Sequence, residues 1–478
     1  MKTTTLQKIS RLIIIVIILG SGLNSKARAQ SLPPQIIADS LQAILNRSLP
    51  TGVQNPGAVV SVYVPGQWAW SGAAGHSISG LTGAYPATAA SPNDKFRAGS
   101  ITKNFMATAV LKLEEAGLLS LQDTIGKYLS STLINDTINS SAPVTIYELL
   151  NHTSGIANSA DNTACQQNAL NNLTQVFSLE EAVFCGASQG EVFPPGFAWD
   201  YSNTNYSLLA MIIQKVSGQT SKDYITQHIL TPLNLTDTEF PTTDQITSPH
   251  LGCYWNIGAW VDMTIVDPTL YWGWADIVST TTDLNKFYSA LRSGQVLSPA
   301  SLTKMMTIAP SAFDYGLGTE FFQLGNTNYF GHSGEVGNSS GMFFADINSS
   351  LYPDGYYVSY NYNYQGVDLF NAIDLPVYNF MLSGITGISA VQQDVMKIKT
   401  YPNPAQDKIS FEFVAGKESK TTLELIDSKG LLVKTISCIL NKGNNKFELN
   451  VNELASGIYT YRVQTNLGVC TGRIEVIN

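Results

Sequence analysis

At residues 96–103 the chain reads Phe-Arg-Ala-Gly-Ser-Ile-Thr-Lys, and this stretch carries its strongest chemical signal. The glycine permits a tight turn before Ser100, and residues 101–116 have the apolar spacing of a helix that ends near Gly117. Lys103 then shares a helix face with Ser100. Burial and a helix N-terminus both disfavour an ammonium ion, so they lower the lysine pKa and make the amine a base for the serine hydroxyl. The backbone N–H of Ser100 can also face a developing oxyanion.

The same spacing recurs at Ser301 and Lys304. There, Ser298 and Pro299 are typical of an N-cap and a first helical residue, which makes Ser301 the third residue of a helix. We therefore prefer Ser100 as the nucleophile.

Two later patterns supply partners for Ser100. Tyr201 and Asn203 flank the start of a predicted helix over residues 203–216, which brings a phenol and a carboxamide together. His332-Ser333-Gly334 precedes a predicted strand over residues 341–345, where a sheet edge could bind an extended substrate. Each pattern alone has a plain structural interpretation: a half-buried aromatic, an N-cap and a surface histidine. The ordered combination SxxK, YxN and HxG is much harder to obtain by chance.

On these motifs the chain resembles the serine β-lactamase and penicillin-binding family, in its class C and D-alanyl-D-alanine carboxypeptidase branch. The resemblance covers about residues 35–382 and includes the stretches 148–155, 195–196 and 278–280. It implies a mixed α/β (α+β) fold, with a β-lactamase-like antiparallel sheet flanked by helices, a helical subdomain, and the site between them.

The resemblance also implies roles for individual residues. Ser100 would be the acylated nucleophile, while Lys103 and Tyr201 would share the proton transfers. Coupled groups share their protons, so which of these two is the acylation base stays open. Glu335 would supply the second oxyanion N–H. The implied substrate-binding residues are Asn203, His332, Ser333, Gly334 and Glu335.

Some positions depart from the family pattern. His332 replaces a lysine, which is closer to carboxypeptidases and esterases than to efficient class C β-lactamases. Residues 272–276 read Trp-Gly-Trp-Ala-Asp where relatives usually have small residues, so bulky rings should reshape one wall of the site. His152 falls in a stretch that resembles a structural turn, and we expect it to be structural.

These observations predict a serine hydrolase that is D-alanyl-D-alanine carboxypeptidase-like or β-lactamase-like and acts on a small-molecule or peptide substrate. The alternatives are an esterase of the same family and a catalytically silent surface protein with a penicillin-type pocket. No HExxH, EF-hand or CxxC pattern occurs, so we predict no metal and no cofactor.

Beyond about residue 390 the sequence changes to short alternating runs separated by turn residues, which predicts a small all-β sandwich over residues 397–478. The stretches 401–404, 454–459 and 472–477 resemble the C-terminal sorting domain of type IX secretion. This resemblance implies the type IX secretion machinery as a partner. The alternative is a carbohydrate- or surface-binding sandwich.

Residues 1–29 are typical of a signal peptide, because a basic start is followed by an apolar run over residues 12–19 and by Ala27-Arg28-Ala29. The apolar run is too short to span a bilayer. We predict a signal peptide (1–29), a hydrolase domain (30–385), a linker (386–396) and the sandwich (397–478). The expected location is secreted or cell-surface, without a stable membrane anchor.

Charge and cysteines set further limits. Residues 31–396 carry 11 basic and 28 acidic side chains, a net charge of −17, which argues against nucleic acid and anionic membranes as partners. In an exported protein, Cys165 with Cys185 and Cys438 with Cys470 could form disulfides, leaving Cys253 unpaired. Free buried thiols are the alternative.

Overall fold

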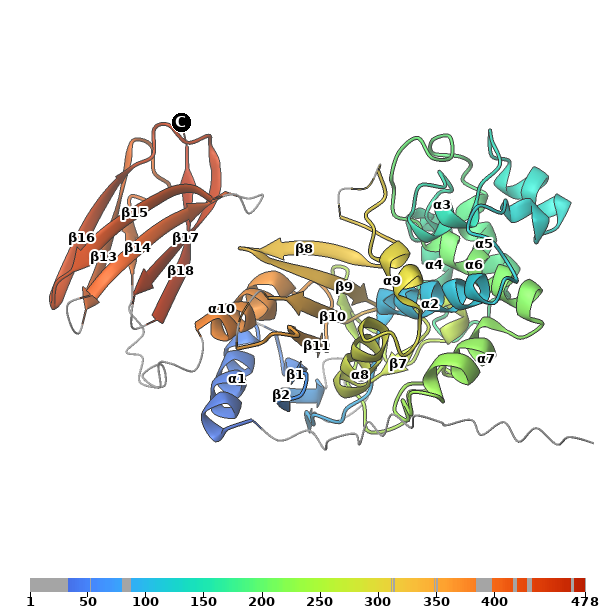
Figure 1. Ribbon diagram of the computed structural model, residues 1–478, viewed down its shortest axis with the longest axis horizontal. Coiled ribbons are helices and arrows are strands. Elements are labelled where there is room, and N and C mark those ends of the chain that lie inside the picture. Colours follow the sequence, from blue (N-terminus) through green and yellow to red (C-terminus); the bar gives the residue numbers. More distant parts are fainter. Residues whose placement is uncertain are drawn as a thin grey trace, which may run out of the picture.

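The computed structural model describes residues 33–51, 53–79, 87–310, 312, 314–347, 349, 351–383, 398–415, 419–427, 432–465 and 468–477. The predicted signal peptide and the predicted domain boundary near residue 390 lie outside these residues. Figure 1 shows a larger α/β part, which carries the motif residues, and a C-terminal part built of strands.

A seven-stranded antiparallel sheet forms the frame of the larger part, in the order β3-β2-β1-β11-β10-β9-β8 (Figure 1). The strands are β1 (Gly57–Val64), β2 (Trp68–Ile78), β3 (Thr88–Ala89), β8 (Glu320–Leu324), β9 (Thr327–Glu335), β10 (Ser339–Asp346) and β11 (Tyr356–Tyr362). β1 pairs with β11, with Ala58 opposite Tyr362, so the two ends of this part of the chain meet in the middle of the sheet.

Both faces of the sheet are covered. In β1, Ala58, Val60 and Val62 belong to the core shared with α1 (Gln35–Ser48) and α10 (Leu375–Ser383). Val59 points the other way, into the core shared with α2 (Thr102–Glu115) and α8 (Thr281–Arg292). Successive residues of a strand face opposite sides of the sheet. Because both sides are covered here, nearly every residue of β1 is apolar.

Helix α2 lies at the centre of the helical side and is buried on almost every face. Phe105 stacks on Phe287 of α8, with ring centroids 3.8 Å apart. Burying a side chain of this size stabilises the fold by roughly 1.5–3 kcal/mol.

The other helices are η1 (Gly99–Ile101), η2 (Ile125–Lys127), η3 (Leu133–Ile138), α3 (Ile146–Leu150), η4 (Ser159–Asp161), α4 (Thr163–Asn171), α5 (Leu179–Ala187), α6 (Asn203–Ser217), α7 (Ser221–Ile225), η5 (Thr226–Leu230), η6 (Pro268–Tyr271), α9 (Pro299–Met305) and η7 (Phe370–Asp374). Two short strand pairs complete the described residues of this part: β4 (Phe96–Arg97) with β7 (Val278–Ser279), and β5 (Tyr254–Asn256) with β6 (Trp260–Asp262).

The helices predicted over residues 101–116 and 203–216 are confirmed as α2 and α6. The strand predicted over residues 341–345 is confirmed within β10, and His332, Ser333 and Gly334 precede it as expected. These three residues also lie in a strand that was not predicted, β9. β9 forms a hairpin with β8, and a two-residue turn at Gly325-Asn326 joins them. A Gly-Asn pair between two strands is a known hairpin signal, so the sequence did contain the evidence.

The C-terminal part consists of two antiparallel sheets, β12-β13-β16 and β15-β14-β17-β18. Its strands are β12 (Lys399–Tyr401), β13 (Lys408–Ala415), β14 (Ser419–Ile426), β15 (Leu432–Leu440), β16 (Gly443–Asn450), β17 (Gly457–Thr465) and β18 (Gly468–Val476). Side chains from both sheets share one core, in which the rings of Phe411 and Tyr461 meet at 5.1 Å. This arrangement is the predicted sandwich.

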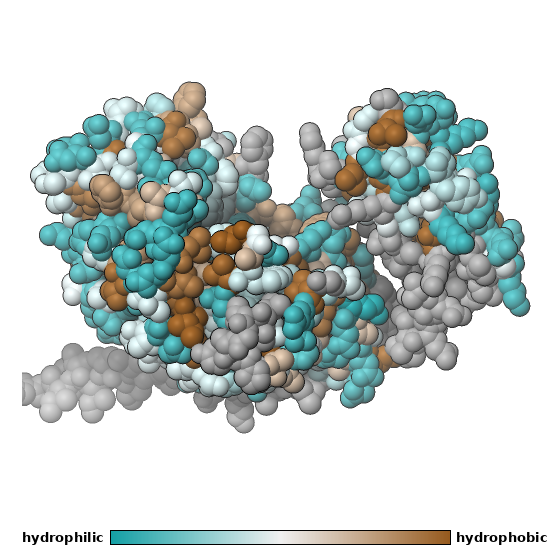
Figure 2. Space-filling model, turned by 180° about the vertical axis from the view of Figure 1, so that it is seen from behind, coloured by the Kyte–Doolittle hydropathy of each residue, from teal (hydrophilic) through white to brown (hydrophobic). Residues whose placement is uncertain are grey.

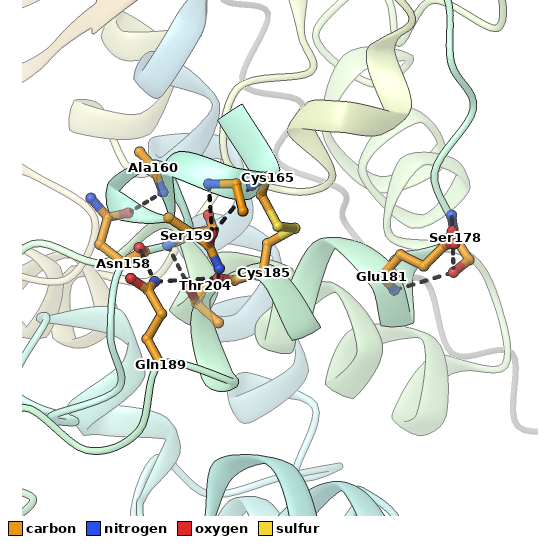
Figure 3. Close-up of a disulfide and its surroundings, with 11 residues drawn as sticks. Asn158, Ser159, Ala160, Cys165, Ser178, Glu181, Cys185, Gln189 and Thr204 are labelled. Carbon is orange, nitrogen blue, oxygen red and sulfur yellow. Dashed lines mark hydrogen bonds between the residues drawn. A yellow bond between two sulfur atoms is a disulfide. The ribbon is translucent and has the colours of Figure 1, made fainter. Parts of the chain in front are cut away.

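Of the two possible disulfides, one is present. Cys165 and Cys185 join α4 to α5, with their Cα atoms 5.9 Å apart (Figure 3). Cys253 is a buried free thiol. Cys438 lies in β15 and Cys470 in β18, on opposite edges of one sheet with two strands between them. Three strand spacings come to about 14 Å, which exceeds the Cα separation of a disulfide, so the backbone of these strands does not bring the two residues together.

Polar side chains cover much of the face shown in Figure 2, and the brown apolar areas on it are interrupted by polar ones. Large apolar side chains that remain exposed include Val176, Phe184 and Phe197. Among the described residues, every helix is too short or too polar to cross a membrane.

Candidate active site

Ser100 lies in η1, the tight turn that leads into α2, and this turn rests against the end of β9. The contact requires glycine on both sides. A Cβ on Gly99, whose φ is +60°, would lie 2.7 Å from the backbone nitrogen of Glu335. A Cβ on Gly334 would lie 2.2 Å from the carbonyl oxygen of Ala98 and 3.0 Å from the nitrogen of Ser100. The backbone amides of Ser100 and Glu335 are therefore close neighbours, as an oxyanion-binding pair must be.

Lys103 is completely buried beside Ser100. Its Nζ lies 3.1 Å from Ser100 Oγ, 2.8 Å from Asn203 Oδ1 and 3.1 Å from the carbonyl oxygen of Trp274. The amine thus joins the turn before α2, the first residue of α6 and the loop over residues 272–276.

The protonation state of Lys103 follows from this enclosure. Burial holds its pKa well below the usual value of 10.5, while the carboxylates of Glu320 and Asp276 raise it by smaller amounts. A neutral amine has two N–H bonds, and the oxygens of Asn203 and Trp274 can only accept them. The lone pair is then left for Ser100, whose hydroxyl can donate to it. This geometry is that of a base poised to take the serine proton.

Tyr201 approaches the same hydroxyl from the loop before α6. It is half-buried, and its ring centroid lies 4.8 Å from Lys103 Nζ. Burial raises the pKa of its phenol well above the usual value of 10, and a hydrogen bond with the Ser100 side chain opposes that rise. The phenol is therefore protonated at neutral pH and can donate.

Asn203 is held in place by a loop that sequence analysis did not single out. Its backbone N–H donates to Asn158 Oδ1 at 3.0 Å. Asn158 in turn accepts a hydrogen bond at its carbonyl oxygen from Gln189 Nε2, which also lies 3.2 Å from the carbonyl oxygen of Cys185 (Figure 3). The disulfide region thus borders directly on the residues that position Asn203.

His332 is fully buried in β9. Its Nδ1 faces two acceptors, the carbonyl oxygen of Ser333 at 2.6 Å and Glu320 Oε1 at 3.2 Å, so Nδ1 carries a proton. Burial is the main reason that the pKa of His332 is lowered, although Glu320 opposes the change. A neutral ring then accepts at Nε2 from the hydroxyl of Tyr315, 2.8 Å away.

Aromatic rings form the wall behind Tyr201. His152 occupies a turn with a φ of +66°, and its ring centroid lies 4.3 Å from that of Tyr201. Its Nδ1 accepts a hydrogen bond from the Ser202 N–H at 3.1 Å. The expected turn is therefore present, and in addition the His152 ring packs on the tyrosine. The ring of Trp274 lies 5.5 Å from Lys103 Nζ, so residues 272–276 do line the site.

The second SxxK pattern lies elsewhere. Ser298 accepts a hydrogen bond from the Ser301 N–H as the N-cap of α9, as the sequence predicts. Lys304 turns away from Ser301 and pairs with Glu114 at 2.9 Å. Instead of facing a lysine, the side chain of Ser301 hydrogen-bonds with the carboxylate of Glu115.

The structure thus brings together the predicted residues Ser100, Lys103, Tyr201, Asn203, His332, Ser333, Gly334 and Glu335. Sequence reasoning missed Glu320, Tyr315 and Asn158. The Gly325-Asn326 hairpin signal would have found Glu320, because counting back across that turn sets it opposite Gly331.

Known protein families resemble this chain in both of its parts. The Beta-lactamase family model matches residues 45–368, and the model of the secretion system C-terminal sorting domain matches residues 399–477. The protein PbpX of Bacillus subtilis (strain 168) is 33% identical over 242 residues, which cover 50% of this chain and 56% of PbpX. Protein flp of Staphylococcus aureus (strain COL) is 36% identical over 158 residues, covering 32% of this chain and 30% of flp. The chain therefore spans about half of one curated relative and a third of the other.

Solved structures match over longer stretches. A D-stereospecific amidohydrolase from Streptomyces sp. is 27% identical, with a TM-score of 0.61, covering 71% of this chain and 98% of that protein. The D-amino acid amidase from Ochrobactrum anthropi SV3 shares the fold at 21% identity and a TM-score of 0.60, covering 73% of this chain and 99% of the amidase. The chain therefore belongs to the beta-lactamase family of serine acyl-transferring hydrolases and carries a C-terminal type IX secretion sorting domain.

Proposed function

We propose that this protein is a secreted serine hydrolase that cleaves an amide or peptide bond through an acyl-enzyme on Ser100, in the manner of a D-alanyl-D-alanine carboxypeptidase or a D-amino acid amidase. The observation that carries the proposal is the contact between Ser100 Oγ and the buried amine of Lys103 at 3.1 Å. The similarity to a D-stereospecific amidohydrolase, at 27% identity, supports a substrate with a D-amino acid on the acyl side.

The first half of the reaction uses groups already in place. Neutral Lys103 takes the proton of Ser100 while Ser100 Oγ forms a bond to the substrate carbonyl carbon. The negative charge that develops on the carbonyl oxygen is stabilised by the N–H groups of Ser100 and Glu335. Tyr201 gives its proton to the leaving nitrogen as the C–N bond breaks, and it regains a proton from Lys103. This assignment makes Lys103 the acylation base.

The second half repeats these transfers with water. Water gives a proton to a base of the Lys103–Tyr201 pair and attacks the acyl carbon, and Ser100 leaves with a proton from the same pair. Asn203 and the β9 residues His332, Ser333 and Gly334 would hold the substrate beside Ser100. Export by a signal peptide and the sorting domain would place this reaction outside the cell.

The test is covalent labelling of the purified mature protein with a fluorophosphonate probe. We expect one adduct by intact mass on the wild type, none on Ser100→Ala, and one on the control Ser301→Ala. Equal labelling of Ser100→Ala and the wild type would refute the proposal. Hydrolysis of D-Ala-D-Ala peptides, D-amino acid amides, a chromogenic cephalosporin and short esters then ranks the substrate classes.

A further inference from the structure

The free edge of β9 beside Ser100 is already in contact with a carboxylate of the chain itself. Pairing between β8 and β9 runs from Leu324 opposite Thr327 to Glu320 opposite Gly331. Within the described residues, β8 therefore does not extend alongside residues 332–335 of β9, and those residues line the site. Residues two apart in a strand point the same way, so the N–H groups of Ser333 and Glu335 face one side, about 7 Å apart.

Glu320 takes up the donors at this edge. Its Oε2 accepts the N–H of Ser333 at 2.8 Å, and its Oε1 accepts the Ser333 hydroxyl at 3.0 Å. Nδ1 of His332 lies 3.2 Å from Oε1. Three donors thus converge on the carboxylate of Glu320. Without Glu320, the same donors could bind a carboxylate of the substrate.

The charge of Glu320 is not balanced by a strong cation. His332 is its one ion-pair partner among the described residues, and burial lowers the pKa of that imidazole. Burial likewise holds the pKa of Lys103 well below its usual value. Burial raises the pKa of Asp314, and the nearby charge of Glu320 raises the pKa of Asp314 further. The side chain of Glu320 is 28% exposed, so its field acts on whatever enters this end of the site.

We propose that Glu320 determines specificity by occupying the anion-binding end of the β9 edge, so that the enzyme rejects substrates with a carboxylate there and accepts those with a neutral or cationic group. This inference rests on the proposed function and narrows it: the favoured substrates are amides and amide-capped peptides, and peptides that end in a free carboxylate are poor ones. A carboxylate placed there would meet like charge and would find its donors already engaged.

A matched pair of peptides tests this inference. N-acetyl-D-Ala-D-Ala and its C-terminal amide differ only in the charge of the terminal group, and cleavage between the two residues releases D-alanine or D-alaninamide. kcat/KM for each would be measured by mass spectrometry on the wild type, on Glu320→Gln and on a control, Glu114→Gln. The control removes a carboxylate that pairs with Lys304 on a different part of the molecule.

We expect the wild type and Glu114→Gln to prefer the amide by at least about tenfold, and Glu320→Gln to reduce that preference by about tenfold through faster cleavage of the free acid. The inference is overturned if the wild type cleaves the free acid as well as the amide, or if Glu320→Gln leaves the ratio unchanged. It is also overturned if Ser100 is labelled by the fluorophosphonate but neither peptide is cleaved. Absence of labelling would instead contradict the proposed function.

Discussion

At the scale of single residues, Lys103 shows how folding creates a base. The side chain is enclosed by α2, α6 and the loop over residues 272–276, and burial holds its pKa well below 10.5. In the unfolded chain the same amine is protonated up to a pH of about 10.4. Folding in that pH range therefore releases a proton, and the stability of the protein must depend on pH.

The expected sign is an increase of stability with pH. Between the lowered pKa of Lys103 and about pH 10.4, the free energy of unfolding should rise by up to about 1.4 kcal/mol per pH unit from this residue alone. Lys103→Met should lose that part of the slope, and it should also lose acylation. Urea unfolding at several pH values measures the slope. Lys112→Met, which removes a lysine from the same helix, is the control, and identical slopes for Lys103→Met and the wild type would contradict the prediction.

How far the residues could be predicted depended on whether their partners lie close in sequence. Ser100 and Lys103 are three apart on a helix, and the family resemblance added Tyr201 and Asn203. Glu320 could be placed only by counting back across the Gly325-Asn326 turn, because its contact with Ser333 depends on the register of that hairpin. Asn158 was also missed, since its role depends on how the loop after α3 packs against α6.

At the scale of elements, the contact between η1 and β9 sets the distance between the two amides that would hold the oxyanion. Ser340 Oγ lies 3.0 Å from the carbonyl oxygens of both Ala98 and Gly334, and so it fixes the two segments to each other. Only a residue without a Cβ fits at position 334.

Gly334→Ala should therefore separate η1 from β9 and reduce kcat by about a hundredfold or more, the usual cost of losing one oxyanion donor. Gly126→Ala is the matched control, because a Cβ at Gly126 meets nothing within 4 Å. Steady-state kinetics measure the loss, and circular dichroism must show that both variants are folded. A folded Gly334→Ala enzyme with full kcat would contradict this account of the contact.

The long helices were predictable because the surroundings of each one change little along its length, and this gives a regular sequence pattern. α2 and α6 have helical periodicity and are followed by Gly117 and Gly218, both with positive φ. β9 was missed because its sequence contains two glycines and no regular alternation of apolar and polar residues. Its residues suit the site rather than a hydrophobic core. A strand shaped by function gives a weak periodic signal.

At the scale of the whole molecule, the hydrolase part and the sandwich have separate hydrophobic cores. A unit with its own core can fold alone, and proteins with several such units depart from a single two-state transition. Calorimetry of the mature protein should show two transitions. A variant that ends at residue 383 should keep the transition of the hydrolase part within about 2 °C and keep kcat/KM for the amide-capped peptide. A single merged transition, or loss of activity on truncation, would contradict this independence.

The disulfide between Cys165 and Cys185 makes the structure around the site depend on when and where the chain is oxidised. A freshly translated chain carries two thiols at these positions, and the cytosol keeps them reduced. The covalent link between α4 and α5 forms only after an oxidant has removed two protons and two electrons. Because the segment beside this link supports Asn158, and through it the start of α6, we expect a newly made molecule to acquire its full rigidity around Ser100 only after this oxidation.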